Sequence, residues 1–516
     1  MATGKKLHNL VLSLSPNEKR YFKLHSNVQN GKKNYLLLFA TLEKMKEDSY
    51  SRELLLNNLK IPSEDLHTTE NYLYLRILES LRMFSEKSSV EAKLYSLLLN
   101  ASILEEKGFY DLSSKMLTKA KSMVVAPNSN PLILEILKRQ ARHIAATETK
   151  NIQKFTDHIC NELTLQANRL KEETAYFQLN QVSFVRYRNW KLAKNETEKE
   201  FITTLQENPL IKEEPINGSF YTKYLRYNTK NNCYALLGQF DKACAEVEQI
   251  VNLWDSYPKL RAQQLELYMI QLSNLINHKN KISDFETAKE LLEKLRGIKT
   301  KTFNEKAEQF QNFYFHQLAY YLNRHEFDMA IELVPKIKAG LKQYNKKVNR
   351  ARKLAFYYNI MVAYFIEGDY EAVIPWLFEI KKIEKGNRPR KDIQRFSRIL
   401  NLTICYKIQT DRGLISLMNM YMEEEQKISS TATKLKEVDL ENMLRSIKRG
   451  NSYIGPLHTF EKMVLKYFKI LFETIPGKEE RKVFKAFKAD LECLPKAQKE
   501  VLGFEEFVLW ITKTYL

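Results

Sequence analysis

Basic side chains are the residues of this sequence whose types and spacing could do chemistry, and that chemistry is the binding of anions. From Pro335 to Ile366 there is no acidic residue, yet this span carries eight lysines and arginines. A second basic cluster extends from Lys381 to Arg398 and contains two acidic residues. From these clusters we define a predicted partner-binding set, the basic strip: Lys342, Lys346, Lys347, Arg350, Arg352, Lys353, Lys382, Lys385, Arg388, Arg390, Lys391 and Arg395.

The net charge of the chain is concentrated in the same region. The 82 basic and 62 acidic side chains give a net charge of +20, of which residues 301–410 supply +9. A solvated edge that keeps the protein soluble would explain this excess. An acidic protein, RNA including the ribosome, or an anionic membrane surface would make functional use of it. Tyr344, Tyr357 and Tyr358 could stack on bases, although the last two are better explained as core residues.

Sequence signatures of catalysis are absent from the chain. The motifs G-x-x-x-x-G-K-[ST], G-x-G-x-x-G, H-E-x-x-H and G-x-S-x-G do not occur. His316 and His325 are nine residues apart, which is the wrong interval for one face of a helix. The five cysteines are scattered without a C-x-x-C pair, which is typical of free, mostly buried thiols. We therefore expect no enzyme activity, no metal, no cofactor and no small-molecule substrate.

The sequence predicts a soluble, cytoplasmic protein without integral membrane association. No segment approaches the roughly 18 apolar residues that are needed to span a bilayer. The N-terminal stretch "MATGKKLHNLVLSLSPNEKR" places two lysines before an apolar patch, but that patch is short and has no small-residue cleavage site. Unpaired cysteines also fit a reducing compartment.

Helices must position the basic side chains. Glycine (14 copies) and proline (13 copies) are sparse for 516 residues, so the chain has too few turn residues for a strand-rich protein. Apolar residues recur at intervals of three and four, which is the period of amphipathic helices. The expected fold class is therefore all-α.

One short turn motif recurs along the chain. It has a Gly or polar residue, an aromatic residue two positions later and a small residue three further on. The copies are "GFYDLS", "GQFDKA", "SDFETA", "HEFDMA" and "GDYEAV", with the aromatic residues Tyr110, Phe240, Phe285, Phe327 and Tyr370. From Phe240 onward the intervals are 45, 42 and 43 residues. The gap of 130 before Phe240 predicts degenerate copies near residues 152 and 195, and a further copy is expected near Arg412.

The copy around Tyr370 shows why the motif predicts a helical hairpin. The helix before the turn should bury one face, formed by Tyr357, Ile360, Met361 and Tyr364. Gly368 supplies a permissive backbone, and Asp369 can cap the following helix. That second helix should face inward with Val373, Leu377 and Ile380. Because a two-helix unit cannot bury both of its faces, such hairpins must stack in series.

The hairpins resemble those of the tetratricopeptide-repeat (TPR) superfamily. "CYALLGQFDKACAEVEQI" has Tyr234, Gly238, Phe240 and Ala243 in the matching positions. The resemblance implies a right-handed superhelical α-solenoid of about eight TPR-like hairpins, with helical caps at both ends, that binds a partner through a helix-lined groove.

The sequence departs from the TPR pattern in three ways. The period of 42 to 45 residues exceeds the family's usual value of about 34. Pro335 and Pro375 lie within expected second helices, where we expect bending or early termination. The family's Lys–Asn clamp for a C-terminal carboxylate is replaced by Asn228 and Asn232, so that binding mode is not supported.

Three segments are expected: an N-terminal helical unit (1–85), TPR-like repeats (86–430) and a C-terminal helical cap (431–516). In the first, Ser15, Pro16 and Glu18 form the pattern of a capping box. A short helix, a Pro-containing turn and a long helix then outline a helix-turn-helix, which is either a DNA-binding element or a cap for the repeats. The cap is favoured because Glu64, Asp65 and Glu70 would face DNA phosphates.

These features together predict a non-enzymatic scaffold or adaptor. It would bind another protein, either acidic or part of a large complex, through the repeat groove and the basic strip. The alternative is a regulator associated with RNA, the ribosome or DNA that uses the basic strip and the N-terminal unit.

Overall fold

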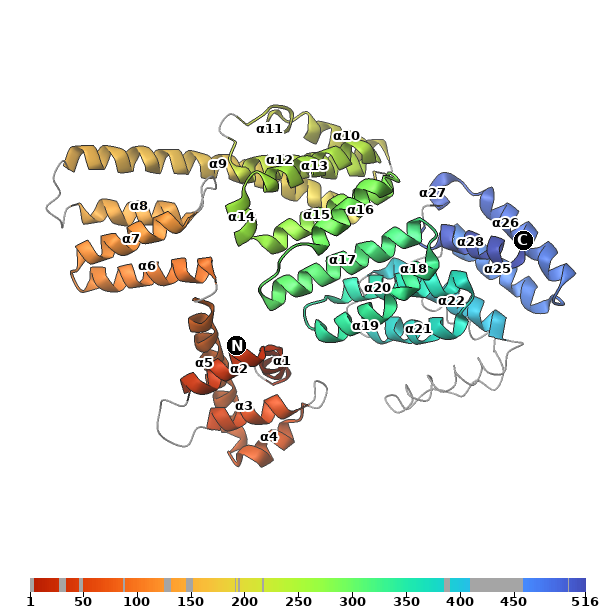
Figure 1. The fold of residues 1–516 in the computed structure, drawn as a ribbon, viewed down its shortest axis with the longest axis horizontal. Coiled ribbons are helices and arrows are strands. Elements are labelled where there is room, and N and C mark those ends of the chain that lie inside the picture. The colour runs from red at the N-terminus through yellow and green to blue at the C-terminus, as the bar shows by residue number, and fades with distance from the viewer. Residues whose placement is uncertain are drawn as a thin grey trace. The chain divides into compact units, whose positions relative to one another are not determined.

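The computed structural model describes most of the chain as helices. The described residues are 4–26, 34–45, 50–86, 89–124, 131–144, 152–190, 192–193, 195–215, 218–384, 390–408, 458–499 and 501–516. Within these ranges all regular elements are helices and no strand occurs, which confirms the all-α prediction (Figure 1). In the same ranges no helix is both long and apolar enough to cross a membrane. The chain divides into two compact units, Met1–Gln264 (unit 1) and Leu265–Leu516 (unit 2).

Unit 1 contains the following described helices: α1 (Lys5–Ser13), α2 (Pro16–Ser26), α3 (Asn34–Lys44), α4 (Arg52–Leu59), α5 (Ser63–Glu86), α6 (Val90–Glu106), α7 (Tyr110–Met123), α8 (Pro131–His143), α9 (Ile152–Trp190), α10 (Glu196–Gln206), α11 (Pro209–Lys212), α12 (Phe220–Leu236), α13 (Phe240–Asp255) and α14 (Pro258–Gln263). The expected segment boundary after residue 85 falls at the end of α5.

Unit 2 contains the following described helices: α15 (Leu265–Lys281), α16 (Phe285–Arg296), α17 (Phe303–Asn323), α18 (Phe327–Glu332), α19 (Val334–Gln343), α20 (Arg350–Glu367), α21 (Tyr370–Glu384), α22 (Lys391–Ile408), α25 (Thr459–Glu473), α26 (Lys478–Glu492), α27 (Lys496–Lys499) and α28 (Phe504–Tyr515). The expected boundary at residue 430 lies outside the described residues.

The first five helices surround a hydrophobic core of their own, to which Phe22, Phe39 and Leu73 belong. The predicted capping box is confirmed: the Ser15 N–H donates to Glu18 Oε2 at 2.7 Å, and the Glu18 N–H donates to Ser15 Oγ at 3.3 Å. The predicted short helix, turn and long helix are α4 and α5.

Glu70 of α5 faces the interior of this bundle. The side chain is buried, and its Oε1 atom accepts hydrogen bonds from the Gly4 N–H at 3.1 Å and the Tyr50 hydroxyl at 3.2 Å. The expectation that Glu70 would face DNA phosphates is therefore wrong, whereas Glu64 and Asp65 are exposed at the start of α5.

All five copies of the turn motif have one backbone geometry. The residue two positions before the aromatic has positive φ in every copy: Gly108 (80°), Gly238 (72°), Ser283 (61°), His325 (60°) and Gly368 (80°). The N–H of the next residue donates to a carbonyl five positions earlier, at 2.8 to 3.0 Å, and each aromatic residue begins the following helix. This is the left-handed, Schellman-type helix ending. The predicted hairpin turns are thus confirmed, including the Asp369 cap, whose Oδ1 accepts the Ala372 N–H at 3.0 Å.

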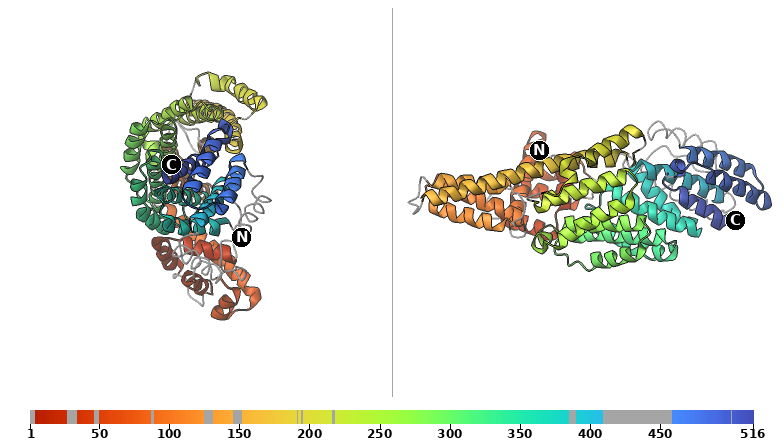
Figure 2. Two further views of the ribbon diagram at one scale, coloured as in Figure 1. Left: turned by 90° about the vertical axis from the view of Figure 1, so that its right-hand side faces the viewer. Right: turned by 90° about the horizontal axis from the view of Figure 1, so that it is seen from above.

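Hairpins pack in chain order within each unit. In unit 1, α6 pairs with α7 and α12 with α13. In unit 2, α15 pairs with α16, α17 with α18 and α20 with α21, while α15, α17 and α20 pack successively against one another (Figures 1 and 2). Sequential packing of this kind is consistent with a helical array.

The degenerate copies differ from the regular ones. Breaks occur where they were expected, since α9 begins at Ile152 and ends at Trp190 before α10 begins at Glu196. Between these breaks α9 is one helix of 39 residues that packs against both α8 and α12, so a single long helix serves two pairs. The copy expected near Arg412 lies outside the described residues.

The two prolines have different effects. Pro335 occupies the first turn of α19, and the helical segment is interrupted at Leu333, between α18 and α19. Pro375 lies inside α21, which continues through it. The expected early termination therefore occurs at the first proline only.

The C-terminal helices belong to the core of unit 2. One hydrophobic cluster joins residues of α17 to α22 with Phe468 of α25, Phe484 of α26 and Trp510 of α28. Helix α28 packs against α20 and forms hydrogen bonds with its hairpin. Tyr358 donates to Glu506 Oε1 at 2.8 Å, and Trp510 Nε1 donates to the Tyr370 hydroxyl at 3.0 Å.

Gly368→Ala tests the turn geometry. A Cβ added at Gly368 would meet no atom within 4 Å, so the change acts through the positive φ alone. We expect local opening of the turn to become easier by about 1 kcal/mol, which is roughly fivefold faster hydrogen exchange at the Asp369 amide. Ser283→Gly, at the equivalent position of another hairpin, should slow exchange at Asp284. Equal exchange in wild type and Gly368→Ala would contradict the role of the turn.

Candidate partner-binding surface

Two links between helices of unit 2 lie side by side. Phe303 is the first residue of α17, and Tyr344 directly follows α19. Their ring centroids are 5.3 Å apart, and Tyr344 also lies 5.3 Å from the ring of Phe310. The link before α17 and the link after α19 therefore meet at this pair of aromatic rings.

A glycine in α19 permits close contact between α19 and Phe310 of α17. A Cβ at Gly340 would lie 1.9 Å from a ring carbon of Phe310, far below any allowed separation. Because Gly340 has no side chain, Phe310 packs directly on the backbone of α19. Phe310 is 7% exposed, whereas Phe303, which also contacts Tyr344, is 46% exposed.

Basic residues lie close in sequence to both rings, in the two links and in the helix ends that adjoin them. We call this set the basic aromatic surface: Phe303, Tyr344, Lys299, Lys301, Lys306, Lys342, Lys346, Lys347 and Arg350. All seven basic side chains are exposed. Across the described part of the chain, no carboxylate lies within 4.0 Å of Lys299, Lys301, Lys306, Lys342, Lys347 or Arg350.

Two further members of the predicted basic strip, Arg352 and Lys353, have partners within unit 2. The Arg352 guanidinium lies 4.3 Å from the ring centroid of Phe315, and its Nη2 donates to Asn312 Oδ1 at 3.4 Å. Burial lowers the pKa of Arg352, the charge of Glu308 opposes this, and the charge of Arg390 lowers the pKa further. The Lys353 ammonium donates to Asn345 Oδ1. Arg352 is thus part of the packing between α17 and α20.

A buried polar cluster lies next to Arg352. Ser273 Oγ of α15 is 2.5 Å from His316 Nε2 and 3.1 Å from Asn312 Oδ1, while Asn312 Nδ2 donates to Glu308 Oε1 at 2.8 Å. Burial, together with the charge of Arg352, lowers the pKa of His316 to about 3. His316 is therefore neutral near pH 7, and its place in the cluster links α15 to α17.

The second basic cluster has nearby carboxylates. Lys382 lies 2.7 Å from Glu379, Arg390 lies 2.9 Å from Asp392, and Arg395 lies 3.9 Å from Glu461. Lys391 begins α22, but its side chain is outside the described structure, as are Lys385 and Arg388. Lys382, Arg390 and Arg395 therefore each have a carboxylate within 4.0 Å, in contrast to Lys299, Lys301, Lys306, Lys342, Lys347 and Arg350.

Sequence reasoning missed the N-terminal half of this surface. Lys299 and Lys301 lie in the link that precedes α17, and Phe303 and Lys306 lie in the first turn of α17, one hairpin before the predicted basic strip. Their signal was present in the repeat itself, because equivalent links of stacked hairpins are neighbours.

A serine, a histidine and a carboxylate form a relay in unit 1. Ser114 Oγ lies 2.9 Å from His143 Nδ1, and His143 Nε2 lies 2.9 Å from Glu105 Oε1. The order matches a nucleophile, base and orienting acid. However, Ser114 lies inside α7, and the Ser113 N–H already donates to the Phe109 carbonyl, so these positions offer no free amide for an oxyanion. The relay joins α6, α7 and α8.

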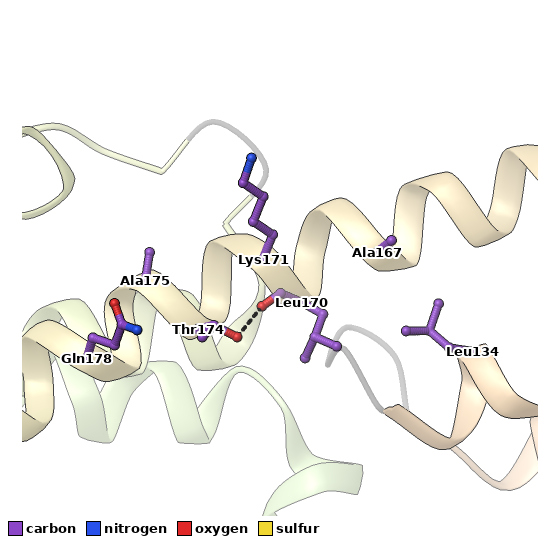
Figure 3. A pocket seen from close by; sticks show the side chains of 7 residues that line it. All are labelled: Leu134, Ala167, Leu170, Lys171, Thr174, Ala175 and Gln178. Atoms are coloured by element: carbon purple, nitrogen blue, oxygen red, sulfur yellow. Dashed lines mark hydrogen bonds between the residues drawn. The ribbon is translucent and has the colours of Figure 1, made fainter.

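Helices α8 and α9 enclose an open groove. It is lined by Leu134 of α8 and by Ala167, Leu170, Lys171, Thr174, Ala175 and Gln178 of α9 (Figure 3). The Thr174 hydroxyl donates to the Leu170 carbonyl at 2.7 Å (Figure 3). Lys171 is the only titratable side chain of this lining, so the groove offers no acid–base pair. Among the described residues, no group of three or more His, Cys, Asp or Glu side chains could hold a metal ion.

Comparison with known proteins identifies no relative. No protein-family model matches the chain, and neither does any curated protein or any solved structure. The functional proposals below therefore rest on the chain's own residues.

Gly340→Ala tests how the aromatic pair is positioned. The added methyl group would overlap the Phe310 ring, so we expect unit 2 to lose about 1 to 3 kcal/mol of stability, seen as a lower thermal midpoint. The double variant Gly340→Ala, Phe310→Ala removes the clash, so its loss of stability should be smaller than the sum of the losses in the two single variants. A rise in the midpoint, as for an unconstrained helix glycine, would show that Gly340 has no such role.

His316→Gln tests the buried cluster through pH. The folded protein keeps His316 neutral down to about pH 3, whereas the unfolded chain gains a proton below pH 6.5. His316 therefore destabilises the wild type progressively as pH falls from 6.5 toward 3, by at most about 1.4 kcal/mol per pH unit. We expect the thermal midpoint of His316→Gln to fall less steeply than that of wild type between pH 7 and 4. Parallel curves would contradict this assignment.

Proposed function

We propose that this protein is a non-enzymatic scaffold that binds an acidic partner protein at the basic aromatic surface. The observation that carries the proposal is the meeting of two links at Phe303 and Tyr344, in a region where six exposed cations have no carboxylate within 4.0 Å among the described residues: Lys299, Lys301, Lys306, Lys342, Lys347 and Arg350. Surface lysines and arginines usually lie among opposite charges. A concentration of unpaired cations attracts a polyanion and accelerates its association.

We also propose that the repeats form a right-handed superhelical α-solenoid of about eight TPR-like hairpins. Its support is the turn motif, whose five copies share one left-handed geometry, and the packing of successive hairpins within each unit. In such an array equivalent links follow one edge, so the edge with the basic aromatic surface is suited to an extended segment of a partner.

Single-stranded nucleic acid is the second candidate partner. Phe303 favours it, because exposed aromatic rings among cations stack on bases. The neighbouring carboxylates oppose it. Burial and the charges of Glu308 and Glu305 raise the pKa of Glu266, and the charge of Lys347 lowers it, so Glu266 interacts electrostatically with two further carboxylates and with Lys347. A phosphate backbone, with a charge on every nucleotide, would be repelled by these carboxylates, whereas an acidic protein segment can place uncharged residues opposite them.

Charge reversal tests the proposal. In affinity capture from native cells, Lys342→Glu, Lys347→Glu and Arg350→Glu combined should lose an acidic partner that wild type retains, because the steering field is inverted. A matched control combines Arg481→Glu, Lys482→Glu and Lys485→Glu, which reverse three exposed cations of α26 that have no ion pair within the described residues. Retention of the same partners by both variants, or their loss from both, would contradict the assignment.

A further inference from the structure

Phe303 is the first residue of the first helix of its hairpin, and another hairpin of the chain has an aromatic residue, Phe220, at the same position. The ring centroid of Phe220 lies 4.6 Å from that of Trp254, in the last turn of the second helix, and 5.4 Å from that of Tyr257, just after that helix. Phe303 contacts Tyr344 in the corresponding way. Phe220 is 0% exposed, whereas Phe303 is 46% exposed. The same local arrangement is thus closed around Phe220 and open around Phe303.

The difference lies in the number of rings that each hairpin supplies. Tyr221 and Tyr224 also lie within 6.2 Å of Phe220, so four aromatic rings surround it. Tyr344 is the only described ring contact of Phe303. Half of an apolar ring surface therefore remains in water, which is unfavourable unless a further apolar group covers it.

Charges define what kind of group fits there. Lys301 and Lys306 lie within one helical turn of Phe303, and Lys342 and Lys347 lie on either side of Tyr344. The apolar spot is therefore bordered by cations from both links. A peptide that has one bulky apolar residue between acidic residues matches this pattern of charge and apolar surface.

A carboxylate next to the ring disfavours a nucleic acid at the same place. Glu305 Oε2 accepts the N–H groups of Lys301 at 2.6 Å and Thr302 at 3.0 Å, so a negative charge is fixed two residues from Phe303. A base stacked on Phe303 would bring its own phosphates to that charge. A peptide can place an uncharged residue there and its carboxylates further out.

We infer that Phe303 and Tyr344 form an anchor site for a bulky apolar side chain within an acidic segment of the partner, and this inference rests on the proposed scaffold function. The lysines orient and attract the segment, and the ring of Phe303 gives it specificity. When the partner binds, the two rings form a small desolvated centre that is bordered by charged side chains. Hot-spot residues of protein interfaces usually have this arrangement.

Two labelled peptides test the anchor. One is a twelve-residue chain of Glu and Asp with a central Trp, and the other has Ser in place of that Trp. With the full-length protein, fluorescence anisotropy should show about tenfold tighter binding of the Trp peptide, a ratio typical of burying one aromatic side chain partially. Phe303→Ser should reduce the ratio to near one. The control Phe109→Ser, at a Phe that is 56% exposed in unit 1, should leave the ratio unchanged.

The outcomes separate the anchor from the scaffold function. Equal binding of the two peptides to wild type, or a ratio that survives Phe303→Ser, would overturn the anchor. If wild type binds both peptides equally and the combined charge reversal of Lys342, Lys347 and Arg350 abolishes that binding, the acidic-partner proposal stands and the anchor does not. Failure of both peptides to bind at low salt would count against both proposals. Tighter binding of a twelve-nucleotide poly(U) RNA than of either peptide would assign the surface to nucleic acid.

Discussion

The left-handed residue that ends the first helix of each hairpin is the constraint on which the rest of the structure depends. A single residue of positive φ reverses the chain within a few positions, and the aromatic residue two positions later is the first residue of the second helix. The two helices then bury only the faces that they share. Each hairpin needs a neighbour to cover its remaining apolar face. In unit 2 the link before α17 and the link after α19 meet at Phe303 and Tyr344, where the basic aromatic surface lies.

The turns could be predicted because their signal is local. Gly368, Asp369 and Tyr370 carry the conformation, the cap and the closing ring within three residues, and the motif was recognisable even where Ser283 and His325 adopt positive φ at some steric cost. The long helix α9 shows the limit of the pattern. Its polar breaks were visible in the sequence, but its continuity depends on packing against α8 and α12 at once, and this involves residues far apart in the chain.

The surface was predictable only in part, for the same reason. An excess of lysine and arginine is a property of composition, so the first basic cluster could be located from sequence. Whether a given cation faces solvent depends on helix phase and on neighbours: Arg352 turns inward to Phe315, and Arg390 is matched by Asp392. Phe303 was not foreseen, because its exposure depends on how few aromatic rings contact it in the folded chain, and Tyr344, the described ring that does, is 41 positions away in the sequence.

Because α28 packs against α20, part of the core of unit 2 can form only after the last helix has been synthesised. Tyr358 and Glu506 are 148 residues apart, and Tyr370 and Trp510 are 140 apart, so these contacts form only after residues 504–516 have been made. At the usual pace of translation the ribosome needs roughly ten to thirty seconds to make that much chain. During this interval Phe365, which stacks on Trp510 in the finished fold, lacks its cover. Until α28 has been synthesised, the face of α20 that includes Phe365 therefore lacks its native contact with Trp510.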